Sequence, residues 1–240
     1  LFPYTTLFRS FFMPALILLF SIPAPVAVAT SLAATLPICA VGSFAHYRNG
    51  NMDLWTGLLF GLTGIAGAVS GAGLTSLMTP RLLRISFGIY SILIGIQMIA
   101  AHRKEKRNNL CDHNGTSGIQ KLAKGTAYGF LAGIVTGTFG TSGTAPVIAG
   151  LFSLRIPIMQ VIGTSLLIVL SNTAFALGSH FILGEIDLTL VYFLTSGSIL
   201  GAVAGPFLLS GIKIEKAEGA IRKWYALGMI GFGILMILVR

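Results

Sequence analysis

Long apolar stretches recur along the chain and limit the folds open to it. They lie near residues 24–46, 53–77, 86–101, 125–154, 157–182, 188–211 and 223–239, after a short apolar segment at 11–20. Most reach about 18 residues, the length at which a helix crosses the hydrocarbon core of a bilayer. A span in lipid must satisfy its own backbone, and the alternating pattern of barrel strands is absent. The sequence therefore predicts an all-α polytopic membrane protein.

Composition agrees with this fold class and limits the partners. Hydrophobic residues make up 54% of the chain and charged residues 10%, which excludes the soluble globular classes. The net charge of +9 comes from Lys and Arg between or beside the apolar spans, so we interpret them as topology signals and expect no nucleic-acid partner. Cys39 and Cys111 have no metal-binding spacing. We expect membrane lipid and a small solute as partners, no metal and no cofactor, and leave a homodimer open.

Two polar segments divide the chain. Residues 1–10, "LFPYTTLFRS", are neither a signal peptide nor a spanning helix, and they resemble translated adapter sequence. We interpret them as a non-native leader. Residues 102–124 are mostly polar and are expected to form a cytoplasmic loop. The remaining chain forms two parts, 11–101 and 125–240.

The two parts are related in sequence. At an offset of 134 residues, 14 of the 42 positions from 30 to 71 are identical to those from 164 to 205. Thr30-Ser31-Leu32 corresponds to Thr164-Ser165-Leu166, and His46, Gly50 and Asp53 correspond to His180, Gly184 and Asp187. Identity at this level without a gap predicts an internal repeat. The first repeat lacks a counterpart of the segment that opens the second, so we expect its first helix to be missing.

The segment "GTFGTSGTAP", residues 137–146, interrupts an apolar span. A continuous helix from 125 to 153 would run about 43 Å, well beyond a hydrocarbon core of about 30 Å. Glycine gives up helical order readily, Ser and Thr can satisfy freed backbone groups, and proline suits the first turn of a new helix. We predict a helix that ends near Phe139, an unwound turn, and a short helix that starts near Ala145.

The distribution of Lys and Arg favours a re-entrant hairpin at this interruption. If 125–154 crossed the membrane once, the cations would divide 8 to 7 between the two sides, whereas a hairpin divides them 12 to 3. Each repeat would then hold a broken or re-entrant helix and three transmembrane helices, and the two repeats would be inverted. The smaller group under the hairpin model is Arg81, Arg84 and Arg240.

Several motifs resemble the TauE/SafE family of sulfite and organosulfonate exporters. They are "GTSGTAP" at 140–146, the repeated "TSL", the His-x-x-x-Gly-x-x-Asp turn and "GAVAG" at 201–205, and the likeness covers about residues 11–240. The resemblance implies a secondary transporter in the cell inner membrane that exports small sulfur oxyanions or organosulfonates. It also permits four full crossings in each repeat. Thr141 and Ser142 stand where many members have glycine, so the substrate is the least transferable property.

The interruption suits an anion. The start of a short helix presents free amide hydrogens and a positive dipole end, and neighbouring hydroxyls add neutral donors. No Lys or Arg lies in the middle of a span, which suits a weakly held oxyanion. The alternative is that the glycines only allow close helix packing. The candidate substrate-binding residues are Gly137, Gly140, Thr141, Ser142, Gly143, Thr144, Pro146, Thr164, Ser165 and Asn172.

Other polar residues have two interpretations each. His46 and His180 end equivalent spans and are candidates for proton coupling, although histidines at such turns are also structural. Asp53 and Asp187 are expected to cap the helices that follow them. All acidic residues lie in loops or at span ends, so we expect no enzyme activity. The alternatives are a transporter of another small anion or metabolite, or a structural membrane protein without transport activity.

Overall fold

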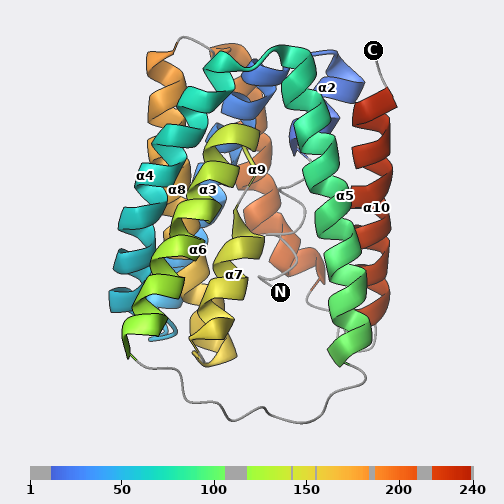
Figure 1. The fold of residues 1–240 in the computed structure, drawn as a ribbon. Helices are drawn as coiled ribbons and strands as arrows, with labels where there is room; N and C mark the ends of the chain where they lie inside the picture. Colours follow the sequence, from blue (N-terminus) through green and yellow to red (C-terminus); the bar gives the residue numbers. More distant parts are fainter. Residues whose placement is uncertain are drawn as a thin grey trace.

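The computed structural model describes residues 12–105, 118–141, 143–154, 156–183, 187–209 and 218–238, and the regular structure of these residues is α-helical throughout. The helices form an upright bundle (Figure 1). Their bounds agree with the predicted spans to within a few residues at most ends. They are α2 (Phe12–Phe20), α3 (Ala24–Arg48), α4 (Leu54–Leu77), α5 (Pro80–Glu105), α6 (Gly118–Phe139), α7 (Thr144–Ser153), α8 (Ile158–Ile182), α9 (Leu188–Leu209) and α10 (Glu218–Leu238).

Four helices are long and apolar enough to cross a membrane over the described residues. They are Ala24–Arg48, Leu54–Leu77, Pro80–Ala100 and Met159–Ile182. Large apolar side chains such as Leu62 and Phe193 point outward, with 67% and 76% of their surface exposed. Such a surface is stable only against lipid or a partner protein. The chain is therefore a multi-pass membrane protein.

The predicted aspartate caps are confirmed. The Asp53 carboxylate accepts a hydrogen bond from the Thr56 amide at 3.2 Å, at the start of α4. The Asp187 carboxylate accepts one from the Thr189 amide at 2.9 Å, at the start of α9. Each carboxylate satisfies an amide that has no carbonyl partner inside its helix.

Helices α4 and α6 run parallel with their backbones in contact. A Cβ on Gly133 would overlap the Gly64 carbonyl, and one on Gly137 would overlap the Ala68 carbonyl. Glycines at four-residue intervals on α6 thus allow the close approach, as in other membrane helix pairs. Gly137 therefore packs against α4.

The orientation of the other helices follows from similar contacts. Helix α8 runs parallel to α4, because Gly57 lies against Leu167 and Gly64 lies against Asn172. Helix α10 runs antiparallel to α5, because Gly88 lies against Gly233 and Gly95 against the Ala226 carbonyl. Figure 1 shows that α3 and α8 run in opposite directions, as do α5 and α10.

The predicted interruption is present within one residue of its expected bounds. Helix α6 ends at Phe139 and α7 begins at Thr144. Gly143 lies against Ala132, and Gly150 lies against the Tyr128 side chain, so α7 runs back along α6. The pair is an antiparallel helical hairpin, and α7 ends on the side from which α6 starts (Figure 1).

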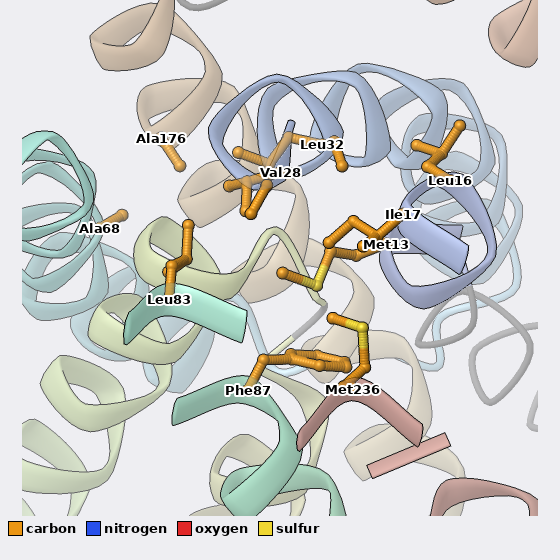
Figure 2. Close-up of a cluster of buried hydrophobic side chains, with 12 residues drawn as sticks. Met13, Leu16, Ile17, Val28, Leu32, Ala68, Leu83, Phe87, Ala176 and Met236 are labelled. Carbon is orange, nitrogen blue, oxygen red and sulfur yellow. The ribbon is translucent and has the colours of Figure 1, made fainter. Parts of the chain in front are cut away.

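Two apolar clusters lie at different depths in the bundle. We call the end where α4, α6 and α8 begin the basic end, because Arg48, Lys121 and Lys223 belong to helix ends there. The basic-end cluster consists of Phe60, Ala132, Val147, Leu151, Val161 and Ile168. The far-end cluster, shown in Figure 2, consists of Met13, Leu16, Ile17, Ala24, Ala27, Val28, Leu32, Ala68, Leu83, Phe87, Ala176 and Met236.

Candidate functional site

Gly140 ends α6 in a conformation that requires glycine. Its φ of +63° is in the left-handed region, which glycine adopts without steric cost. Its amide donates to the Thr136 carbonyl at 3.0 Å, and its carbonyl accepts from the Ser31 hydroxyl of α3 at 2.9 Å. A Cβ here would also stand 2.5 Å from the Val28 carbonyl. Helix α3 therefore fixes the turn by both contact and hydrogen bonding.

The last carbonyls of α6 are satisfied by neighbouring helices. His180 Nε2 of α8 lies 2.9 Å from the Gly137 carbonyl, and the Thr75 hydroxyl of α4 donates to the Thr138 carbonyl at 3.2 Å. Because a helix end leaves four carbonyls without intrahelical partners, these contacts allow α6 to end inside the protein. His180 is fully buried and belongs to this site.

His46 lies elsewhere. It is buried near the end of α3, and its Cβ stands 3.0 Å from the position of a Cβ on Gly163, near the start of α8. The structure therefore places the two candidate histidines at opposite ends of the bundle, and only His180 at the interruption.

The start of α7 holds neutral donors. The Gly143 amide donates to the Thr136 hydroxyl at 3.0 Å, and Pro146 has no amide hydrogen. The amides of Thr144 and Ala145 are the remaining first-turn groups that have no acceptor within α7. The hydroxyls of Thr141 and Thr144 are buried and have no hydrogen-bond partner. Ser142 is outside the described residues.

Aromatic side chains hold the turn against α5. The Phe139 ring stacks on Tyr90 with centroids 5.2 Å apart and meets Phe87 edge-on at 5.8 Å. The Tyr90 hydroxyl lies close to Thr141 without a well-aligned hydrogen bond to it. Offset and edge-on ring pairs stabilise such contacts beyond area burial. The last residue of α6 is thus anchored next to the unpartnered Thr141 hydroxyl.

Asn172 places a buried amide in the middle of α8. It is 0% exposed, and neither its Oδ1 nor its Nδ2 has a hydrogen-bond partner. It faces Gly64, where a Cβ would stand 2.8 Å from Nδ2. Glycine on α4 therefore leaves the space that this amide occupies. An unpaired buried amide is destabilising by about 1–3 kcal/mol.

Thr164 and Ser165 are not at the turn. The Thr164 hydroxyl accepts from the Asp53 amide at 2.9 Å, and the Ser165 hydroxyl donates to the Ile162 carbonyl of its own helix at 2.8 Å. Thr164 precedes His180 by 16 residues, about 24 Å along α8. Ser31, which corresponds to Ser165 in sequence, reaches the turn instead.

We predict that Thr164→Val destabilises the protein by about 1 kcal/mol, because it removes the acceptor of the Asp53 amide at the start of α4. Thermal unfolding in detergent measures this effect. Ser165→Ala is the matched control, since its hydroxyl bonds only within α8 and should leave the unfolding temperature nearly unchanged. Equal unfolding temperatures for both variants would contradict the assigned contact.

Three residues that were not among the sequence candidates hold the turn between α6 and α7 in place. Ser31, Thr75 and Thr136 satisfy the backbone around the turn. The sequence identities between the two parts of the chain included Ser31 as part of "TSL", but nothing in the sequence indicated that it would contact the turn between α6 and α7. No group of three or more metal-binding side chains occurs among the described residues.

Comparisons with known proteins agree with this architecture. Residues 10–236 match the family described as sulfite exporter TauE/SafE. The chain is 31% identical over 201 residues to the probable membrane transporter protein YdhB of Bacillus subtilis, covering 81% of this chain and 79% of that protein. It is 24% identical over 213 residues to a probable membrane transporter protein of Xylella fastidiosa, covering 88% and 79%. No solved structure matches the chain significantly. The chain thus belongs to the TauE/SafE family and is a membrane transporter.

Proposed function

We propose that this protein moves small sulfur oxyanions or organosulfonates across the cell inner membrane, outward, and that the α6–α7 turn binds them. The observation that carries the proposal is a set of buried neutral donors without partners, the hydroxyls of Thr141 and Thr144 and the amide of Asn172. Polar groups left unpaired in a native protein require an explanation, and an unbound ligand is one.

The chemistry of these donors suits an oxyanion. Hydroxyl and amide hydrogens bind a negative oxygen through charge-assisted hydrogen bonds, and the start of α7 adds its positive dipole end. A lysine or arginine at this depth would bind the anion firmly and hinder its release. Neutral donors favour a substrate that must be held and then released, as transport requires.

The arrangement of the helices supports two inverted repeats. Counterparts in sequence run in opposite directions, α3 against α8 and α5 against α10 (Figure 1). Inverted repeats place a binding site near the bilayer midplane, at interrupted helices. By the positive-inside rule, we assign the basic end to the cytoplasm.

Reporter fusions test this topology. We expect fusions after Ser153 and after Ile212 both to report a cytoplasmic location, because the hairpin returns the chain to the basic end before α8 begins. Alkaline phosphatase and green fluorescent protein fusions give opposite signals for the two sides. A periplasmic signal at Ser153 would contradict the hairpin in the membrane.

Transport of labelled anions tests the function. Vesicles that contain the protein should take up labelled sulfite or sulfoacetate faster than empty vesicles, and Thr144→Val should lower that rate. Uptake of another small anion alone would favour the alternative substrate class. Equal uptake with and without the protein for every anion would favour a structural role and end the proposal.

A further inference from the structure

The unpartnered Asn172 amide lies between the two apolar clusters. Along α8, Ile168 belongs to the basic-end cluster, Asn172 follows, and Ala176 belongs to the far-end cluster. Along α4, the same order is Phe60, Gly64 and Ala68. Two helices thus independently place the Asn172 amide between layers of apolar side chains.

The hairpin repeats this order. On α6, Ala132 belongs to the basic-end cluster and Phe139 packs against the far-end cluster. On α7, Thr144 precedes Val147 and Leu151 of the basic-end cluster. Since α7 runs back toward the basic end, the Thr144 hydroxyl lies deeper than the cluster that its own helix helps to form.

Phe60 belongs to the basic-end cluster. Its side chain is fully buried, and a Cβ on Gly125 of α6 or on Gly150 of α7 would each stand 2.8 Å from a ring atom. The ring therefore fills the space between the two arms of the hairpin. A larger residue at either glycine would require the ring to move.

The far-end cluster closes the opposite side. Figure 2 shows the side chains of Met13, Phe87 and Met236 pointing toward one another, from three helices. The Phe87 ring also contacts Phe139 at the end of α6. Apolar side chains packed to this degree exclude water and hydrated ions, as hydrophobic constrictions in channels do.

We propose that the two clusters are the two gates of the transport path, with the Phe60 ring as the basic-end gate and the Phe87 ring as the far-end gate. This inference rests on the proposed function, since it assumes that a solute reaches the donors between the clusters. The structure then represents the occluded state. Opening toward the basic end requires the Phe60 ring to leave the space between Gly125 and Gly150.

Cysteine accessibility tests the gates without any transported anion. Cys39 and Cys111 are replaced by alanine, Asn172→Cys supplies the single thiol, and a membrane-impermeant methanethiosulfonate reagent is applied to inside-out and right-side-out vesicles. We expect Phe60→Ala to raise the labelling rate from the basic end at least about tenfold, or about 1.4 kcal/mol in the opening equilibrium. Phe87→Ala should raise the rate from the far end only.

A matched control and a second variant keep the test decisive. Phe175→Ala on α8 removes a ring that is 51% exposed and should change neither rate. If Phe60→Ala does not accumulate, Leu151→Ala opens the same cluster from α7. Unchanged labelling in the gate variants, or an equal increase from both faces, would overturn the gates. Selective labelling, together with no anion uptake by the protein that retains Asn172, would support the gates and instead contradict the proposed substrate.

Discussion

Replacing Asn172 by leucine should lower anion transport by about 10-fold to 100-fold while leaving the folded protein at least as stable. Neither amide atom has a partner in the protein, so the leucine removes a buried polar group that is destabilising by about 1–3 kcal/mol. The anion loses a charge-assisted hydrogen bond of about 1.5–3 kcal/mol, which corresponds to the expected loss in rate. Uptake in vesicles and thermal unfolding in detergent measure the two effects separately.

A matched substitution shows whether the two effects are linked. Thr138→Val also removes a buried hydroxyl, but that hydroxyl lies 3.3 Å from the Gly71 carbonyl and donates to it. We expect Thr138→Val to lower stability by about 1 kcal/mol. A loss of stability in Asn172→Leu that equals or exceeds this value would mean that the amide serves folding, and the anion site would have to lie elsewhere.

Replacing Gly133 by leucine should prevent the protein from accumulating in a folded state. A Cβ there would overlap the Gly64 carbonyl and stand 2.7 Å from the Ala68 amide nitrogen. Both are backbone atoms of α4, so relief requires the two helices to separate, and overpacking of this kind is destabilising by about 1–3 kcal/mol or more. The elution profile of a fluorescent fusion on size-exclusion chromatography reports the folded fraction.

Gly73→Leu is the control for this prediction. It lies on α4, the helix against which Gly133 packs, and a Cβ there would meet no atom within 4 Å. Leucine also favours a helix by up to about 1 kcal/mol relative to glycine, so Gly73→Leu should accumulate normally. A normal elution profile for Gly133→Leu would show that the helices do not approach as closely as described.

The sequence predicted the ends of helices more successfully than the contacts that those ends make with other helices. The excess length of the span and its Gly, Thr and Pro content placed the interruption within one residue of its bounds, because these are local properties of the chain. The caps at Asp53 and Asp187 were predictable for the same reason. Contacts such as that of Ser31 with Gly140 depend on which helices become neighbours, and spacing along the chain carries no such information.

Because the sequence does not show which helices become neighbours, it also did not show the contacts that two candidate site residues make. Thr164 is part of a motif that follows the interruption, yet α8 carries it to the turn between α3 and α4. Gly137 belongs to the interruption in sequence, yet it packs against Ala68. A leucine at Gly143 would likewise meet Ala132 and the Thr136 hydroxyl, so that substitution would disturb the hairpin as well as the site.

The glycine contacts between α5 and α10 determine which parts of the bundle can move independently. Backbones that touch directly, as at Gly88 and Gly233, cannot slide without large steric overlap. Helix α5 meets the end of α6 through the rings of Phe87, Tyr90 and Phe139, and rings can exchange rotamers and repack. We therefore expect α5 and α10 to move together as one rigid body during a transport cycle. This body would rotate about its contact with the aromatic rings.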